Sequence, residues 1–527
     1  MQKKTSISTI TLWFILVFMI AANGYYQLWN QYGSPGERGV IKWDVISYYA
    51  YLPATFIYGD VTLGFIDNPP EDFVNDNKFW YYSMEDGSRV IRTSMGLAFL
   101  YTPFFLIAHG LAPYFNLASD GYSSIYQFFL VLSSLFYVMM GLMLLKRILL
   151  RFFSQTATAI TLLLVALGTN LFFYTVHEGP MSHSYNFALL TLFLYLVIKW
   201  HEEPSNKRSF LLGLVYGLIV LVRPSNVLVG VLFLGWGVRG PGAIRARFLL
   251  LLKHYKMLLL MVSFFILPWI PQMIYWKSVT GSLFYNSYGP SGSSFFLNSP
   301  HIIDLLFSFR SGWYLYTPVM FVATLGLYFL GRKCKAGVWP LTTLLVLQIY
   351  LLSCWWSWWN GGSFGLRSFV DIYGLMALPL AALIDASLSS KRFVAIITTA
   401  VLGFFLYVNQ FQTIQYTQGI IHFIGNTKES YSLNFLRFNP NGGFWQMLAI
   451  PDTQLARLGI YYDYHSGDDY TTIKSLGTDD GKELVRDEIQ NDREIIRQIR
   501  KHANRTGISF DEALSMVVDR VYDHKSS

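Results

Sequence analysis

Residues 124–147 read SIYQFFLVLSSLFYVMMGLMLLKR. The run is almost entirely apolar and carries no charge before Lys146 and Arg147. A helix needs about 20 predominantly apolar residues to cross the hydrocarbon core of a bilayer. Basic residues directly after such a run are typical of a span that ends on the cytoplasmic side. The stretch therefore predicts a transmembrane helix together with its orientation.

The composition of the whole chain points the same way. Of 527 residues, 53% are hydrophobic, 17% are aromatic and only 14% are charged, whereas a soluble domain carries about 25% charged residues. The net charge of +8 arises from short Lys/Arg clusters between apolar segments, so the chain lacks the basic face of a nucleic-acid-binding protein. Two cysteines are too few for a disulfide framework or a thiolate metal site.

The same length criterion, applied along the chain, predicts an all-α polytopic membrane protein with about eleven spans. These lie near residues 9–29, 124–147, 157–176, 182–200, 209–223, 225–238, 256–276, 313–331, 339–357, 368–388 and 393–411. The first follows Lys3 and Lys4 and resembles a secretory signal, but we expect it to remain as a span. The fifth and sixth are short and flank Arg223-Pro224, so they could form one broken element.

Placing the N-terminus inside puts the basic clusters in cytoplasmic loops, as the positive-inside rule requires. The short outer loops keep only four cations, which are Arg223, Lys277, Arg310 and Arg367. Residues 30–123 become a long outer loop. It contains two interrupted apolar segments, 44–58 and 95–115, which we expect to be interfacial helices. If residues 95–115 were a span, every later loop would change sides.

We expect a transmembrane domain over residues 1–411 and a polar tail over 412–527. Within the tail, apolar residues recur at helical spacing from Glu483 to His502. Ser509 stands three residues before Glu512, a capping-box pattern that opens a second helix. The tail therefore predicts a helical hairpin near 483–523, which an eleven-span count places outside.

Polar residues at the predicted outer ends of spans are the candidates for function, because polar groups at membrane depth are costly. Asp44 follows the first span and could be a general base or a helix N-cap. Arg92 could bind a lipid-linked phosphate or anchor to headgroups. His177, Glu178 and His183 could ligate a metal, contact a polar substrate or form a structured turn.

Two further clusters stand at outer ends. Arg223 lies between two short apolar runs and must face a polar cavity or the interface. The second cluster reads WWSWWNGGSFGLR from Trp355 to Arg367. Stacked Trp rings, Trp359 among them, suit sugar rings, and the alternative is an interfacial aromatic belt. A belt does not account for the Gly-rich turn that ends in Arg367.

Taken in order, these clusters resemble the GT-C superfamily of membrane glycosyltransferases, closest to the branch of protein O-mannosyltransferases and lipid A aminoarabinose transferases. The resemblance covers most of residues 5–411. It rests on an acid after the first span and on the following segments: Gly96 to Phe105, Leu221 to Pro224, Tyr275 to Phe284, Phe309 to Pro318, and Gly361 to Arg367. Val45 follows Asp44, so the adjacent acidic pair of some members is absent, and Glu178 is the candidate for a second acid.

The resemblance implies transfer of a sugar from a polyprenyl-phosphate donor to a glycan, lipid or protein acceptor outside the cytoplasm, with inversion. It makes Asp44 the base and Arg92 and Arg367, then Arg310 and Arg223, the ligands of the donor phosphate. It implies a bacterial cytoplasmic membrane as the location, membrane lipids as neighbours and no nucleic-acid partner. No cofactor is expected with certainty, and a divalent metal remains open.

Three other functions remain open. A transporter or flippase would place its ionisable residues at mid-membrane and show repeated halves, and no repeat is visible. A polysaccharide polymerase or ligase would carry its main loop late in the chain. A non-catalytic scaffold is the last alternative. The outer clustering of charge and the long first loop favour the transferase.

Overall fold

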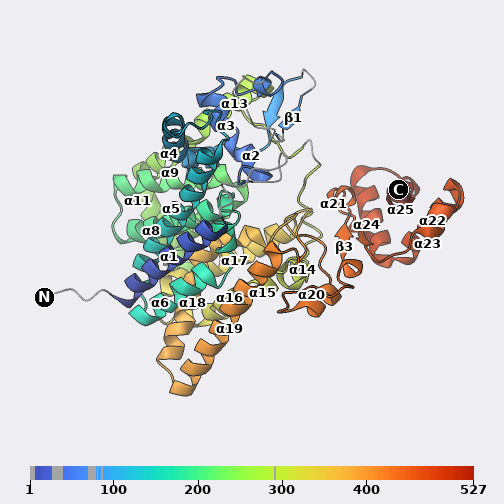
Figure 1. The fold of residues 1–527 in the computed structure, drawn as a ribbon. Helices are drawn as coiled ribbons and strands as arrows, with labels where there is room; N and C mark the ends of the chain where they lie inside the picture. The colour runs from blue at the N-terminus through green and yellow to red at the C-terminus, as the bar shows by residue number, and fades with distance from the viewer. Residues whose placement is uncertain are drawn as a thin grey trace. The chain divides into compact units, whose positions relative to one another are not determined.

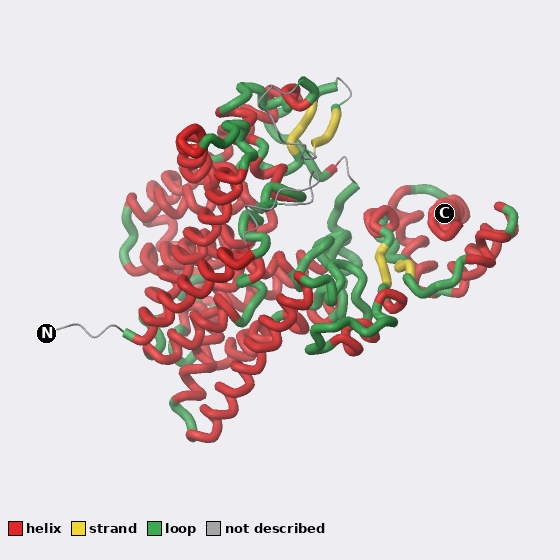
Figure 2. Tube along the Cα trace, viewed as in Figure 1, coloured by secondary structure: helices red, strands yellow, loops and turns green. Residues whose placement is uncertain are grey.

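A computed structural model of the chain describes residues 6–26, 39–68, 79, 81–84, 87–289 and 292–526. The chain divides into two compact units. Unit 1 comprises Met1–Ser287, Tyr316–Ile349 and Arg367–Gln410, and unit 2 comprises Tyr288–Leu315, Tyr350–Leu366 and Phe411–Ser527. Both units are mainly helical (Figures 1 and 2).

The elements of unit 1 are as follows. The α-helices are α1 (Ile7–Tyr26), α2 (Asp44–Tyr49), α3 (Tyr51–Phe56), α4 (Gly96–Leu111), α5 (Ser124–Leu149), α6 (Gln155–Leu167), α7 (Phe173–Val176), α8 (Ser182–Glu202), α9 (Asn206–Val222), α10 (Gly230–Gly235), α11 (Pro241–Lys253), α12 (Tyr255–Ile266), α13 (Trp269–Thr280), α16 (Pro318–Leu330) and α18 (Tyr373–Leu388). The short 3-10 helices are η2 (Gly64–Ile66), η3 (Ala112–Phe115), η4 (Pro224–Val229), η6 (Lys335–Gly337) and η7 (Arg367–Ile372). One antiparallel hairpin pairs β1 (Tyr81–Ser83) with β2 (Arg89–Ile91).

Three helices run from one unit into the other along the chain: α15 (Trp313–Tyr316), α17 (Val338–Ser353) and α19 (Arg392–Thr417). Unit 2 itself contains α14 (Ile302–Phe307), α20 (Lys428–Asn434), η8 (Trp445–Met447), β3 (Ala449–Pro451), α21 (Thr453–Arg457), β4 (Asp463–His465), α22 (Thr471–Ser475), α23 (Thr478–Asn491), α24 (Arg493–Thr506) and α25 (Phe510–Ser526). Strands β3 and β4 pair antiparallel.

Several long apolar helices indicate a multi-pass integral membrane protein. Within the described residues, six helices are long and apolar enough to cross a membrane: Ile7–Tyr26, Gly96–Phe115, Ser124–Leu149, Lys335–Ser353, Arg367–Leu388 and Arg392–Thr417. A seventh is added if the bent pair Gly242–Lys253 and Tyr255–Ile266 forms one span. Five of the six coincide with predicted spans. The full set of eleven stays a prediction.

Some predicted spans are broken or short in the structure. The stretch 157–176 becomes α6 and α7, because α6 ends at Leu167 with Gly168 as its C-cap. The stretch 256–276 becomes α12 and α13, which begins after Pro268, and a proline cannot donate the backbone hydrogen bond that continues a helix. The fifth and sixth stretches are α9 followed by η4 and α10, with the break at Arg223-Pro224.

The segment 95–115 is one continuous helical stretch, so the expectation of an interrupted one was wrong. Helix α4 runs through Pro103, as membrane helices tolerate. Helix α4 packs alongside α5: the Leu100 carbonyl oxygen accepts a hydrogen bond from Tyr137 Oη in the middle of α5, and the Phe104 ring lies 5.7 Å from that of Phe136. Gly96 approaches Val222 at the end of α9, and His109 Nδ1 lies 2.6 Å from Tyr126 Oη in the first turn of α5. Helix α4 thus runs antiparallel beside the first half of α5, and Gly96–Phe115 is long and apolar enough to cross a membrane, so its interfacial placement stays a prediction.

Contacts between helix ends show that the basic clusters of unit 1 lie at one end of its helices. At what we call the basic end, four contacts join the termini of helices: Lys146 with Thr9, Ser8 with Gln155 at 2.6 Å, Arg151 with Glu202, and Lys333 with Asp385 at 3.2 Å. The opposite end, called the site end, holds the end of α1, where the Tyr26 ring lies 4.1 Å from that of His177. The basic clusters predicted to be cytoplasmic thus gather at one end of the bundle.

Close helix packing in unit 1 depends on glycine at one interface in particular. Gly213 and Gly217 of α9 face the backbone carbonyl oxygens of Met261 and Phe265 of α12, and a Cβ atom at either glycine would come within 2.2 Å of those oxygens. This four-residue spacing of small residues is a common device for close approach of membrane helices. It fixes the position of α9, and with it that of Arg223, the residue that follows α9 as its C-cap.

The C-terminal part of unit 2 is a three-helix arrangement instead of the predicted hairpin. The helix expected from Glu483 to His502 divides because Asp492 Oδ1 accepts hydrogen bonds from the backbone N–H groups of Glu494 and Ile495, which starts α24. The predicted cap at Ser509 is confirmed, since its Oγ accepts the Glu512 N–H at 3.1 Å. Apolar side chains of α23, α24 and α25 form one core, which includes Val485, Ile489, Ile499, Val517 and Val521.

Candidate active site

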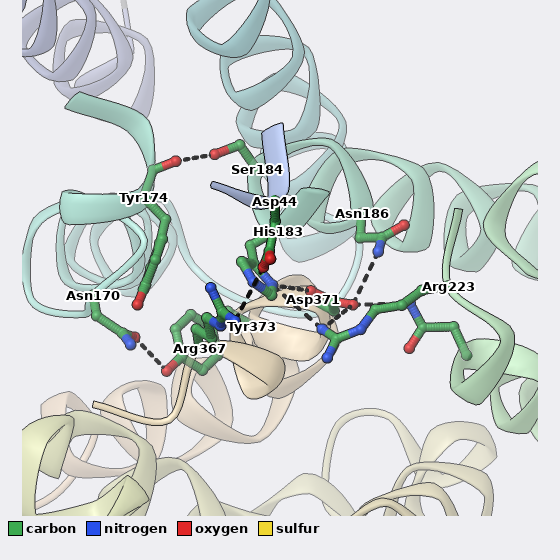
Figure 3. A network of polar contacts seen from close by, with 11 residues as sticks. Asp44, Asn170, Tyr174, His183, Ser184, Asn186, Arg223, Arg367, Asp371 and Tyr373 are labelled. Atoms are coloured by element: carbon green, nitrogen blue, oxygen red, sulfur yellow. Dashed lines mark hydrogen bonds and ion pairs between the residues drawn. The ribbon is translucent and has the colours of Figure 1, made fainter. Parts of the chain in front are cut away.

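Asp44 and Arg367 form an ion pair at the site end of unit 1. Asp44 Oδ2 lies 3.1 Å from Arg367 Nη2 (Figure 3). Asp44 opens α2, directly after Trp43, whose backbone has φ +50° and ψ −130°. Arg367 opens η7 after a turn in which Asn360, Gly361 and Gly365 all have positive φ. Both charged side chains keep part of their surface exposed, 36% for Asp44 and 20% for Arg367.

Glu178 belongs to the same charged group. It is half-buried in the loop between α7 and α8. Burial raises the pKa of Glu178, the positive charges of Arg367 and Lys42 oppose that rise, and the negative charge of Asp44 adds to it. The net effect is an increase, so this carboxyl keeps its proton to a higher pH than a solvated glutamate. The candidate for a second acid thus lies within electrostatic reach of the first.

A second polar cluster surrounds Asp371, whose side chain is fully buried. Its Oδ1 lies 3.1 Å from His183 Nδ1. Its Oδ2 accepts hydrogen bonds from Asn186 Nδ2 at 3.0 Å, Asn226 Nδ2 at 2.9 Å and Arg223 Nη1 at 3.3 Å (Figure 3). Donors from α8, from the end of α9 and from η4 therefore converge on one carboxylate of η7.

The sequence did not single out Asp371. A signal was present, because it is the one acid in the apolar stretch between Arg367 and Asp385, and an acid within a predicted span is a functional candidate by default. The four donors that surround it come from other segments and give no local signal.

The two histidines of the predicted cluster have different surroundings. His183 lies within the Asp371 cluster, and its ring meets that of Tyr174 edge-on at 5.2 Å. His177 packs between the rings of Tyr26 and Phe173. Burial lowers the pKa of His177 to about 4, so it is neutral at physiological pH. We therefore find His183 in the polar network and His177 in an aromatic contact.

Arg92 lies in the short connection between β2 and α4. Its guanidinium carbon is 4.4 Å from the centroid of the Tyr82 ring. Two residues later, Ser94 Oγ donates a hydrogen bond to the Leu221 carbonyl oxygen. The connection that carries Arg92 is thereby attached to the end of α9, two residues before Arg223.

Arg310 and Trp359 belong to unit 2. Arg310 Nη2 donates hydrogen bonds to Asp463 Oδ2 at 2.8 Å and to the Ala449 carbonyl oxygen at 3.0 Å. Its guanidinium lies 5.4 Å from the centroid of the Trp359 ring. Trp359 is only 1% exposed, so it offers no ring face to a sugar in this structure. A phosphate would have to compete with Asp463 for Arg310.

Within the described ranges, no three His, Cys, Asp or Glu side chains come together as a metal ion would require. The His177–Glu178–His183 segment, for which a metal was one alternative, sends its members to different neighbours. The geometry therefore offers no donor set among these residues for the divalent ion that the sequence left open.

No protein-family model matches the chain, and none of the curated proteins matches its sequence. Among solved structures, the chain is similar to the oligosaccharyltransferase of Archaeoglobus fulgidus in its apo form. The match has 12% sequence identity and a TM-score of 0.36, and covers 90% of this chain. The chain spans only 59% of the length of that protein.

Proposed function

We propose that this chain is a membrane glycosyltransferase that moves a sugar from a polyprenyl-phosphate-linked donor to an acceptor outside the cytoplasm. The observation that carries the proposal is the Asp44–Arg367 ion pair, with Glu178 within electrostatic reach of both. A base and a phosphate-binding cation are the two groups that such a transfer needs side by side. The position of the pair, at the end of unit 1 opposite the basic clusters, supports an active site on the outer face.

The first step is donor binding. In the structure the Arg367 guanidinium is paired with Asp44 at 3.1 Å. A donor phosphate takes over the Arg367 guanidinium, which binds phosphate well because its planar fork can make two parallel hydrogen bonds. Asp44 is then released from the ion pair and can face the acceptor.

The second step is transfer. The acceptor oxygen or nitrogen attacks the anomeric carbon, the bond from that carbon to the phosphate oxygen breaks, and Asp44 takes the proton of the acceptor. The transition state has oxocarbenium character, by analogy with glycoside hydrolysis, and in-line attack inverts the anomeric centre. Negative charge grows on the departing polyprenyl phosphate, where Arg367, Arg223 and Arg92 are the candidate stabilising cations. Loss of one such group costs about 3 kcal/mol of transition-state stabilisation.

The test is Asp44→Asn, expressed as the sole copy of the protein in the cell. We expect the variant to reach normal levels in the membrane, yet to lower transfer by about 100-fold or more, because general-base catalysis contributes that much. One glycan should disappear while its lipid-linked donor accumulates, as in cells that lack the protein. Both pools are measured by mass spectrometry of lipid extracts and of released glycans.

Asp67→Asn is the matched control, because Asp67 lies in the same predicted outer loop and is ion-paired with Arg89 at 2.5 Å, outside the Asp44–Arg367 group. It should leave both pools unchanged. Near-normal glycan in the Asp44→Asn strain removes Asp44 from the mechanism.

A transporter of a lipid-linked substrate is the second candidate, and the buried Asp371 cluster favours it, since ionisable groups among membrane helices often mark transport pathways. Sidedness of the accumulated donor separates the two functions. If the missing protein is a transferase, the accumulated donor faces outward, and an impermeant oxidant such as periodate oxidises it in intact cells. If the missing protein is a transporter, the accumulated donor faces the cytoplasm and is protected from the oxidant until the membrane is permeabilised.

A further inference from the structure

Asp371 lies in the same short helix as Arg367. Helix η7 runs from Arg367 to Ile372, so the carboxylate that is fully buried and the guanidinium that is 20% exposed are four residues apart on one rigid turn. Anchoring Asp371 therefore also fixes the backbone from which Arg367 reaches Asp44.

The anchoring of Asp371 is specific. Asn186 and Asn226 both direct their amide nitrogens to Asp371 Oδ2. Their buried amide oxygens have no hydrogen-bond partner among the described residues. An unpaired buried carbonyl oxygen costs free energy. The two amides are thus oriented so that their nitrogens donate to the carboxylate, although this leaves their oxygens unpaired within the described part of the chain.

Arg223 is held by one edge only. Its Nη1 donates to Asp371 Oδ2 at 3.3 Å and lies 3.3 Å from His183 Nδ1. These are the polar side-chain contacts of Arg223 among the described residues, and the side chain is 22% exposed. A guanidinium has five N–H donors, so most of them remain available for a ligand.

Arg223 Nη1 lies 3.3 Å from His183 Nδ1, and Arg367 opens the short helix whose Asp371 lies 3.1 Å from the same nitrogen. Figure 3 shows the two arginines approaching the region of that ring from different helices. Arg223 is paired with the buried Asp371, Arg367 is paired with Asp44, and both guanidinium groups are partly exposed, an arrangement suited to a phosphate.

We propose that Asp371 is a positioning residue that holds Arg223, and through η7 Arg367, in the geometry that binds the phosphate of a polyprenyl-linked ligand. Asp371 does not touch the reacting atoms. It fixes one edge of Arg223 so that the opposite edge faces the ligand. This inference rests on the proposed function, because it takes a lipid phosphate as the ligand of both arginines.

The experiment measures binding of a polyprenyl monophosphate to the full-length protein in lipid nanodiscs, with the matching polyprenol as the ligand without phosphate. The variants are Arg223→Gln, Asp371→Asn and the double variant, compared by quenching of tryptophan fluorescence. Each single variant should weaken phosphate binding about tenfold, the loss expected for a charged hydrogen bond, and leave polyprenol binding unchanged. The loss in the double variant should be smaller than the product of the two single losses, because part of the effect of Asp371 acts through Arg223.

Asp385→Asn is the matched control. Asp385 is a buried acid near the other end of α18, where it accepts the Ser154 N–H at 3.1 Å and pairs with Lys333. Its substitution should leave phosphate affinity unchanged. If Asp371→Asn cannot be purified folded, Asp371→Glu replaces it, since the longer side chain keeps the charge but displaces Arg223. Asp371→Glu should likewise weaken phosphate binding and spare polyprenol binding.

Three results overturn the inference: phosphate affinity unchanged in the Asp371 variants, equal losses for phosphate and polyprenol, or losses that multiply in the double variant. In each case a wild-type preference for phosphate over polyprenol leaves the proposed function standing. If the wild-type protein shows no such preference, the proposed function itself fails, and the inference fails with it.

Discussion

Trp43 adopts a backbone conformation that L-amino acids rarely adopt, with φ +50° and ψ −130°, and the next residue is the candidate base Asp44. Such a conformation costs about 1–3 kcal/mol and persists only where the surrounding structure enforces it. The Trp43 side chain is exposed, so burial of the indole does not compensate for that cost. The conformation instead sets the direction in which Asp44 begins α2.

Under the proposed function, Glu178 should give the site a pH dependence. Its pKa is raised by burial, so its protonated form persists above about pH 4.3, the ordinary midpoint of a glutamate. Ionised Glu178 repels a donor phosphate. Phosphate affinity should therefore be highest at low pH and should fall as the pH rises through the raised pKa. The free energy of unfolding should also fall as the pH rises through the raised pKa, because burial penalises the charged form.

Glu178→Gln should abolish the fall in phosphate affinity that ionisation of Glu178 causes. We expect the ratio of polyprenyl phosphate affinities, wild type over Glu178→Gln, to fall with increasing pH, whereas the titration of the ligand itself cancels from the ratio. The measurement is the same nanodisc binding assay at a series of pH values. A ratio that stays flat across the series would show that the charge of Glu178 does not reach the bound phosphate.

At the scale of elements, the packing of α9 on α12 decides where Arg223 lies. Gly213 and Gly217 let the α9 backbone approach carbonyl oxygens of α12 more closely than any side chain would permit. Helix α9 ends at Val222, and Arg223 follows as its C-cap. A displacement of α9 along or away from α12 therefore moves Arg223 relative to Asp371.

Gly213→Ala should destabilise the protein by about 1–3 kcal/mol, the usual cost of overpacking a tight contact. The added Cβ would lie 2.1 Å from the Met261 carbonyl oxygen, so the helices must separate. Thermal unfolding in detergent measures the loss. Gly403→Ala in α19 is the control, because a Cβ there meets nothing within 4 Å and alanine favours a helix. Equal midpoints for the two variants would mean that α9 and α12 do not pack as described.

At the scale of the whole molecule, unit 1 separates its charges by end. Lys146, Arg151 and Lys333 lie at the basic end, where they contact Thr9, Glu202 and Asp385. The Asp44–Arg367 pair lies at the site end. The positive-inside rule predicts that the site faces the exterior, where the proposed function needs a lipid-linked donor and an acceptor to meet.

Cysteine labelling tests this orientation. Glu203→Cys, which follows α8 at the basic end, should react with an impermeant maleimide only after the membrane is permeabilised. Ser282→Cys, which follows α13, should react in intact cells. Both positions are exposed, whereas the native Cys334 and Cys354 are buried and provide the unlabelled background. The reverse pattern would place the Asp44–Arg367 pair in the cytoplasm and contradict the proposed function.

The sequence by itself determined the class of protein, several spanning helices and the helix cap at Ser509. Apolar length, basic flanks and capping residues are local properties. Each segment's own residues decide whether it partitions into lipid or stays in water. Local signals were less reliable where one residue competes with its neighbours. Pro103 did not interrupt α4, and Asp492 divided a helix whose apolar spacing continues across it.

Only the tertiary structure decided which charged groups meet. It pairs Asp44 with Arg367, surrounds Asp371 with donors from three other segments, engages Arg310 with Asp463 and buries Trp359. Each of these contacts joins residues distant in the chain, so its formation depends on the register and spacing of packed helices. Hydropathy and periodicity describe the surroundings of one segment and carry no information on that register.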